Sequence, residues 1–269
     1  MPSWVRFDDR MSASHTGKLP QVTLVFWIMK IAATTLGETA GDLLAQTLHV
    51  GYLLSSAILV GLFLATVVAQ LVVRTFHPVL YWTVILSTSM AGTTMSDFMN
   101  RTVGLGYAKG AIVLITALAT VFAIWKLSGR PFDVQRIDTF GGELLYWTAI
   151  LFSNTLGTSL GDFLADDTPL GFGRTALVIL GVLAVIAVAR RSDAISNTLL
   201  FWMAFVLTRP LGASAGDFFS KPTAAGGLGY GTIAASAALG AVLVVLTLYM
   251  SWQRRATAVR PAMMSASAD

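Results

Sequence analysis

Acidic residues recur in this chain at one fixed place in a repeated pattern, and they are the residues best suited to chemistry. In each copy an Asp follows a Trp by fifteen residues, with a Gly five residues before the Asp and a Gly or Ser directly before it. The four acids are Asp42, Asp97, Asp162 and Asp217. Carboxylates at equivalent positions of an apolar chain raise the hypothesis of a buried site for cations or protons.

Further polar residues precede each Asp in steps of four, which places them on one helix face. This polar stripe comprises Lys30, Thr34 and Glu38; Ser89 and Thr93; Asn154 and Thr158; and Arg209. Because polar faces are costly in lipid, the four stripes should face inward and stack in layers. The stripe holds five acids against two bases, so a bound cation or a shared proton is expected to compensate. Carboxylate and hydroxyl oxygens suit hard cations such as Na⁺, Mg²⁺, Ca²⁺ or Mn²⁺.

Other interpretations of these residues stay open at this point. Each Asp could cap a helix end at a membrane interface, and the site could instead take a small organic solute. Lys30 and Arg209 each occur in one repeat only. They could form a buried ion pair, Lys30 with Glu38 or Arg209 with a neighbouring Asp, or act as fixed positive charges that select a substrate.

Small residues four apart accompany every Asp and predict close packing of helices. They are Gly37 and Gly41, Gly92 and Ser96, Gly157 and Gly161, and Gly212 and Gly216. Such spacing lets two helix backbones approach one another inside a bilayer.

Composition places the chain in a membrane. Of 269 residues, 55% are hydrophobic and 12% charged, and the mean hydropathy is +0.71. Apolar stretches of about twenty residues, the length that spans a bilayer, predict eight transmembrane helices. They lie at about 22–45, 51–73, 79–99, 105–126, 142–165, 171–190, 195–219 and 229–252. The basic residues sit in loops, which membrane topology explains better than nucleic-acid binding.

The predicted domain organisation is a tail at 1–21, one all-α membrane domain at 22–252 and a disordered tail at 253–269. The domain divides into four two-helix repeats, at about 22–75, 76–127, 142–192 and 195–252, which share one orientation. We therefore expect a pseudo-four-fold bundle whose first helices surround a polar axis. Lys and Arg gather in the tails and in the loops between repeats, so both termini are expected in the cytoplasm.

Two groups of residues outside the stripe are predicted to have other roles. The repeat tryptophans lie at the opposite end of their helices from the aspartates and are predicted to anchor the protein at the membrane interface. Arg101, Asp166, Asp167 and Lys221 are predicted to be solvated loop charges that could shape an outer vestibule.

With these residues in view, the chain resembles a family of bacterial membrane-anchored proteins built from four tandem two-helix repeats of unknown function. The resemblance covers Leu24 to Trp252 and is carried by the repeat tryptophans and by three segments, 35–42, 154–162 and 209–222. The second repeat departs most, with Ser96 in place of Gly and Met90 where other repeats have Thr or Pro. The resemblance implies a bacterial inner-membrane location and no particular activity.

The sequence thus favours passage or exchange of small cations, with Glu38 and the four aspartates as ligands or proton carriers. The alternatives are a proton-coupled transporter of a small organic solute and a membrane scaffold or sensor that transports nothing. No cysteine is present, the three histidines are scattered, and there is no Ser-His-Asp arrangement or nucleotide loop, so an enzyme is not expected. No cofactor is expected beyond a possible cation of unknown identity.

Overall fold

The computed structural model describes residues 20–266, except 74, 132–136, 138 and 192–194, and for residues 254–266 it describes the backbone alone. Within these ranges the fold is all-helical, and each repeat contributes two long helices. The first helices of the repeats, called the ring helices, are α1 (Leu24–Asp42), α3 (Pro78–Asp97), α5 (Phe140–Asp166) and α7 (Asn197–Ser220). The second, called the outer helices, are α2 (Tyr52–Val72), α4 (Tyr107–Leu127), α6 (Gly171–Ala189) and α8 (Gly231–Ala266).

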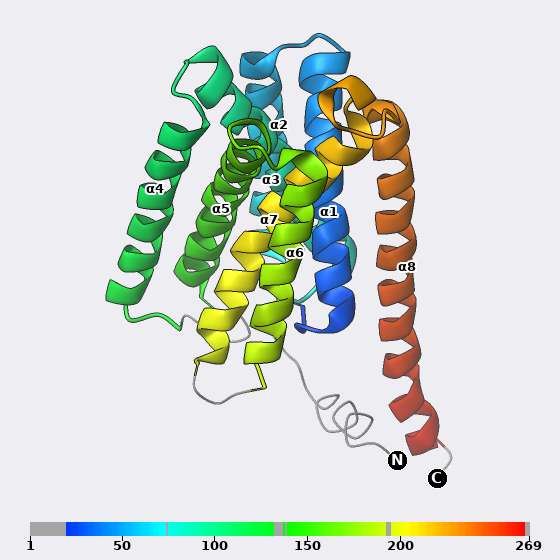
Figure 1. Ribbon diagram of the computed structural model, residues 1–269. Coiled ribbons are helices and arrows are strands. Elements are labelled where there is room, and N and C mark those ends of the chain that lie inside the picture. The colour runs from blue at the N-terminus through cyan, green and yellow to red at the C-terminus, as the bar shows by residue number, and fades with distance from the viewer. Residues whose placement is uncertain (1–19, 74, 132–136, 138, 192–194, 267–269) are drawn as a thin grey trace.

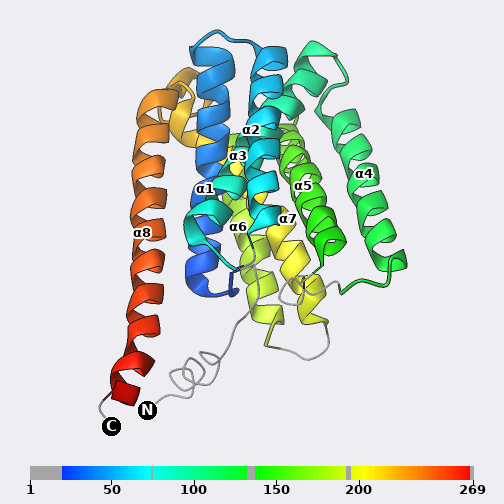
Figure 2. The ribbon, with the colours of Figure 1, turned by 180° about the vertical axis from the view of Figure 1, so that it is seen from behind.

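The ring helices pack in a closed circle. Helix α1 contacts α3 and α7, and α5 contacts the same two helices from the other side. Each outer helix lies against the ring helix of the following repeat, α2 on α3, α4 on α5 and α6 on α7, and α8 completes the circle on α1 (Figures 1 and 2). The aspartates lie at the end where α8 begins, called the aspartate end, and the repeat tryptophans lie at the opposite, tryptophan end.

The small residues before the aspartates lie where one ring helix meets the next. Gly37 of α1 faces Ser89 of α3, and Gly92 of α3 faces Asn154 of α5. The same contact continues around the circle, from Gly157 to Arg209 and from Gly212 to Thr34. The backbone of each ring helix therefore lies directly against the polar stripe of its neighbour.

The second small residue of each motif repeats this arrangement one turn later. Gly41 faces Thr93, Gly161 faces Ala213 and Gly216 faces Glu38. In the second repeat, where Ser96 replaces Gly, its hydroxyl lies 2.8 Å from that of Ser159 on α5. A hydrogen bond there replaces the bare backbone contact.

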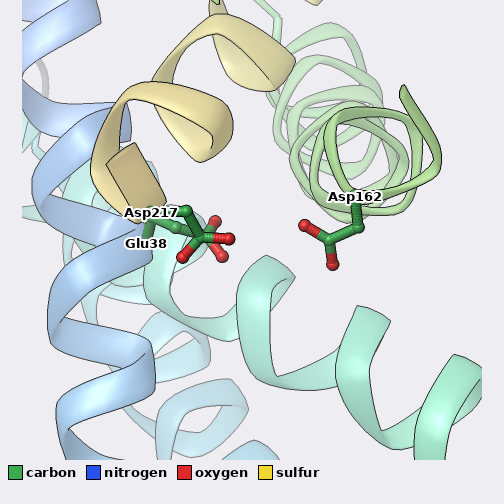
Figure 3. A group of neighbouring side chains, drawn as sticks. All are labelled: Glu38, Asp162 and Asp217. Atoms are coloured by element: carbon green, nitrogen blue, oxygen red, sulfur yellow. The ribbon is translucent and has the colours of Figure 1, made fainter. Parts of the chain in front are cut away.

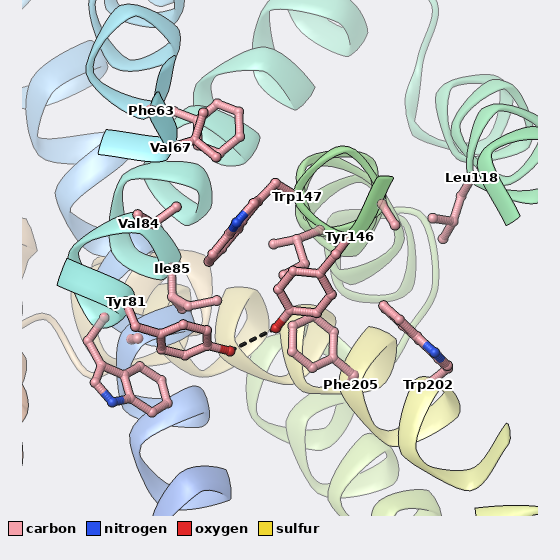
Figure 4. Packing of buried hydrophobic residues seen from close by; sticks show 14 of the residues in the cluster. Phe63, Val67, Tyr81, Val84, Ile85, Leu118, Tyr146, Trp147, Trp202 and Phe205 are labelled. Carbon is pink, nitrogen blue, oxygen red and sulfur yellow. Dashed lines mark hydrogen bonds between the residues drawn. The ribbon is translucent and has the colours of Figure 1, made fainter. Parts of the chain in front are cut away.

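The tryptophan end is filled by aromatic side chains, contrary to the prediction of interfacial anchors. Trp82 and Trp147 are at most 2% exposed, Trp202 is buried and Trp27 is half-buried. Trp82 and Trp147 each pack edge-on against the tyrosine that precedes them, and the two tyrosines, Tyr81 and Tyr146, share a hydrogen bond of 2.8 Å (Figure 4). The prediction was wrong because the neighbouring helices bring enough aromatic surface together to bury the indoles among themselves.

The interior of the ring next to this aromatic layer is also packed. Ile85, Ile150, Phe205 and Lys30 lie one turn beyond Thr34, Ser89, Asn154 and Arg209 along the stripe, and all four side chains are completely buried. Three of these side chains are apolar and fill the ring toward the tryptophan end, and Lys30 is packed beside them.

The outer helices carry the surface expected for contact with lipid. Five helices in the described part of the chain are long and apolar enough to cross a membrane: α2, α4, α6, α7, and α8 as far as Gln253. The ring helices α1, α3 and α5 fall short by this measure, because the polar stripe lowers their hydropathy. The arrangement is compatible with a membrane protein.

The two halves of the chain differ in the turns after the aspartates. Helices α1 and α3 continue beyond Asp42 and Asp97 as short π-helices, Leu43–Thr47 and Phe98–Thr102, whereas α5 and α7 remain α-helical past Asp162 and Asp217.

At the C-terminal end of the chain, α8 extends to Ala266 and so includes much of the segment predicted as a disordered tail. Its continuation Gln-Arg-Arg-Ala consists of good helix formers.

We predict that Gly92→Ala destabilises the ring. The added methyl group would lie 2.9 Å from the backbone carbon of Asn154 and the backbone nitrogen of Thr155, neither of which can rotate away. Overpacking of this kind costs about 1–3 kcal/mol, visible as a lower midpoint in thermal unfolding of the detergent-purified protein. Gly181→Ala on α6 is the control, because nothing lies within 4 Å of its added methyl. Equal midpoints for the two variants would contradict the close packing of α3 on α5.

Candidate functional site

The polar stripes of the four ring helices meet inside the bundle and are almost completely shielded from solvent. Thr34, Ser89, Asn154 and Arg209 form one layer, and all four are completely buried. The next layer comprises Glu38, Thr93, Thr158 and Ala213, and the third comprises the four aspartates, each 2–3% exposed. The structure thus brings together the stripe residues of these three layers, although the four elements are far apart in the chain.

An ion pair between Arg209 and Glu38 lies at the centre of the second layer. The guanidinium Nη1 of Arg209 is 2.9 Å from Oε2 of Glu38. The same carboxylate oxygen accepts hydrogen bonds from the hydroxyls of Thr93 (3.1 Å) and Thr158 (3.2 Å). Arg209 also donates to Ser89 O at 3.2 Å and to the Thr93 hydroxyl. One ion pair with its hydrogen bonds therefore connects all four ring helices.

Lys30 takes no part in this network. Its ammonium lies 4.1 Å from the centre of the Phe205 ring and has no hydrogen-bond partner among the described residues. The suggested pairs, Lys30 with Glu38 and Arg209 with an Asp, are therefore not the ones formed. Arg209 reaches Glu38 because their helices α7 and α1 are in direct contact, with Gly216 facing Glu38 across them.

Two bases that were predicted to be solvated loop charges reach the aspartates, although Arg101 itself is exposed. Arg101 Nε is 2.9 Å from Asp97, and its Nη2 is 3.9 Å from Asp162. Lys221 Nζ is 2.7 Å from Asp42 and 3.5 Å from Asp217. Each base therefore bridges aspartates of two adjacent ring helices, Arg101 between α3 and α5 and Lys221 between α7 and α1.

The sequence contains a signal for these two residues. Arg101 and Lys221 lie four residues after Asp97 and Asp217, and counting forward by four gives Gln46 in the first repeat and Asp166 in the third. Gln46 donates to Asp42 at 2.6 Å, so it belongs to the site as well, whereas Asp166 is exposed. The stripe does not stop at the aspartates, because the helices continue beyond them.

Lys221 follows the last residue of α7 and remains a cation despite its partial burial. Burial lowers the pKa of its ammonium, but the charges of Asp217 and Asp42 and the hydrogen bond to Asp42 outweigh this and raise the pKa above its ordinary value. With Arg101 and Lys221 included, five acids face four bases, so the formal excess is one negative charge instead of three.

Three carboxylates nevertheless converge on one point, although each of them also has a base within 4 Å. Glu38, Asp162 and Asp217 each offer an oxygen atom, and these oxygens lie within 4.8 Å of one another (Figure 3). All three side chains are buried. Asp217 Oδ1 accepts no hydrogen bond, with Lys221 3.5 Å away. Three buried carboxylate oxygens at this separation could hold a hard cation, which prefers oxygen ligands.

The side chains of Asp42 and Asp97 make no capping hydrogen bond to the turns that follow them. Their recorded partners are the side chains of Gln46, Lys221 and Arg101 instead. The chemistry of this layer is therefore that of buried carboxylates facing bases.

We predict that Arg209→Gln is strongly destabilising, because it leaves Glu38 buried without a counter-charge. Breaking a buried ion pair on one side costs about 3–5 kcal/mol in the free energy of unfolding. The double variant with Glu38→Gln should recover part of this loss, which a double-mutant cycle measures. Arg174→Gln, at an exposed position of α6, serves as the control. Additive effects of the two single changes would contradict the coupling of Arg209 to Glu38.

Comparison with known proteins assigns a family to this architecture. One family model, described as Repeat of Unknown Function (DUF347), matches four tandem segments, residues 25–76, 80–131, 145–192 and 200–256. Each match covers most of one ring helix and most or all of the outer helix that follows it. No curated protein and no solved structure matches the chain. The four matches together cover well over half of the residues, and the chain belongs to this family of four-repeat proteins of unknown function.

Proposed function

We propose that this protein spans a membrane eight times and carries a small hard cation, bound by Glu38, Asp162 and Asp217. The observation behind this proposal is the convergence of the three buried carboxylate oxygens within 4.8 Å of one another. In this arrangement the outer helices shield the ring helices from lipid, so α1, α3 and α5 cross the membrane in spite of their polar stripes. The closed circle of helix contacts favours a pseudo-four-fold arrangement of the repeats.

The charge balance supports a cation rather than an anion as the ligand. Arg209 is already engaged by Glu38, and Arg101 and Lys221 by aspartates. Around Asp162 and Asp217 the acids outnumber the bases, and placing like charges together in a buried site is unfavourable unless a cation or a proton joins them. Oxygen ligands without nitrogen or sulfur favour Na⁺, Mg²⁺, Ca²⁺ or Mn²⁺.

The packed tryptophan end favours a carrier over an open channel. Ile85, Ile150 and Phe205 fill the ring beside the polar layers, so a cation held at Asp162 has no open path in that direction. Release on that side requires the ring helices to move apart. In the proposed topology both termini lie in the cytoplasm of a bacterium, and the aspartate end faces outward.

The burial of Lys30 favours a second candidate function, a proton-coupled carrier of a small anionic solute. Its ammonium is completely buried and has no hydrogen-bond partner among the described residues, so a carboxylate or phosphate could satisfy it. Arg209, the other base once considered for this role, is held by Glu38. This candidate predicts stabilisation by organic anions that Lys30→Gln abolishes.

We predict that one cation of a panel containing Na⁺, Mg²⁺, Ca²⁺ and Mn²⁺ raises the midpoint of thermal unfolding. At a hundred times its dissociation constant, a ligand of the folded state adds about 2.7 kcal/mol to the free energy of unfolding. Asp162→Asn and Asp217→Asn should each abolish the shift, because each removes a charged ligand. Asp167→Asn, which changes an exposed acid nearby, should keep it.

The controls separate binding from general electrostatics. A shift of equal size in all four proteins would indicate non-specific screening and would contradict the site. If no cation shifts the wild type, the carboxylates serve the structure alone and the protein is better explained as a scaffold or sensor. Flux into liposomes then tests transport with the cation that binds.

We further predict that Arg101→Gln strengthens cation binding by about tenfold, equivalent to about 1.4 kcal/mol. Arg101 lies 3.9 Å from Asp162, so its guanidinium competes with a bound cation for the same carboxylate. Isothermal titration with the stabilising cation measures the change. Lys109→Gln, at an exposed position near the start of α4, is the matched control. Weaker binding in Arg101→Gln would mean that this arginine supports the site and does not compete with the ligand.

A further inference from the structure

A groove of about 780 Å³ opens on the side of the bundle near the tryptophan end, away from the polar axis. It lies between the first half of α1, the last half of α6 and the first half of α7. Most of its wall is apolar and includes Trp27, Ile31, Leu183, Ala184, Phe201 and Ala204. No part of the proposed cation site contributes to it.

The groove has the length of one membrane leaflet. On α7 its lining runs from Asn197 to Thr208, and on α6 from Leu180 to Arg190. At 1.5 Å per helical residue these stretches measure roughly 15–16 Å, and half of a hydrocarbon core of about 30 Å is roughly 15 Å. The part of one acyl chain that lies within a leaflet would therefore fit along the groove, from the level of Asn197 to the level of Thr208.

The end of the groove at the helix termini is polar and positive. Arg190 lies there with Asn197, Thr198 and Thr23. Helices α1 and α7 both begin at this level, and the residue before α7, Ser196, makes no side-chain capping bond. Uncapped amide groups at a helix start and an arginine side chain both favour a negatively charged oxygen ligand.

We propose that this groove is a binding site for an anionic phospholipid. The acyl chain lies along Ile31, Leu183 and Ala204, and the phosphate sits by Arg190 and the first turn of α7. Basic pockets between transmembrane helices are known to hold acidic headgroups in this way. The inference rests on the membrane location proposed above but not on the cation site, which involves none of these residues.

Native mass spectrometry of the delipidated full-length protein tests this inference, with equal amounts of dioleoyl phosphatidylglycerol and dioleoyl phosphatidylcholine. The wild type should retain phosphatidylglycerol with a preference of about fivefold, the contribution expected of one basic residue near a headgroup. Arg190→Gln should remove the preference. Arg191→Gln, which changes the adjacent exposed arginine outside the groove, should keep it.

A second pair of variants tests the acyl part of the site. Ala187→Trp fills the groove from α6 and should lower retention of both lipids, whereas Val188→Trp, exposed on the same helix but outside the lining, should not. Equal retention of the two lipids by the wild type would overturn the proposal, as would equal losses in Arg190→Gln and Arg191→Gln. A dimer that Ala187→Trp disrupts, without any lipid preference, would instead assign the groove to a second copy of the chain.

The same variants separate this inference from the proposed function. Ala187→Trp and Arg190→Gln should keep the cation-dependent shift in unfolding midpoint, because the groove and the carboxylates share no residue. A protein that fails to partition into the membrane fraction would contradict both proposals, whereas loss of the lipid preference alone contradicts only the groove.

Discussion

The close approach of four helix backbones is the constraint on which the rest of the structure depends. Because small and polar side chains line the contacts between the ring helices, the association of these helices relies on van der Waals packing and on polar contacts. The glycines of the small-residue motifs supply the van der Waals packing, because a side chain added at these glycines would crowd the next helix. The polar contacts follow from this close packing, since the same approach of the backbones brings each polar stripe within hydrogen-bonding distance of its neighbours.

Charge breaks the regularity that the backbone packing creates. Arg209 has a basic counterpart in no other repeat, and Arg101 and Lys221 share a repeat position that carries a base in two of the four copies. Each of the three bases links side chains on different ring helices. Two interfaces of the aspartate layer, α3 with α5 and α7 with α1, are thereby joined by a base, whereas among the described residues no base links the aspartates of α5 and α7 or those of α1 and α3. The uneven distribution of bases thus makes the interfaces of this layer electrostatically unequal.

Much of this architecture could be predicted from the sequence, because periodic signals report backbone contacts well. Eight helices in four repeats follow from the apolar periods, and the family match confirms the repeats. The inward stripe follows from residues four apart. The acid with which Arg209 forms its ion pair could not be predicted, because whether Arg209 reaches Glu38 or an Asp depends on which helices are neighbours. The ion pairs of Arg101 and Lys221 were missed because the helices were predicted to end at about residues 99 and 219, which placed both bases in loops. The tryptophans were misassigned because hydropathy ignores the preceding aromatic residues, Phe26, Tyr81, Tyr146 and Phe201.

The contact of α8 with α1 closes the circle of contacts between outer helices and ring helices. Every outer helix rests on the ring helix of the following repeat, including the last on the first, and α1 begins at the end of the bundle where α8 finishes (Figure 1). The order in which the chain visits the helices is therefore not what holds them in place. A circularly permuted chain that starts at α3 and joins α8 to α1 through a linker retains every helix pair, as expected where termini lie at one face of a domain. The fold is in this sense a ring of helices that has been opened at one of its connections.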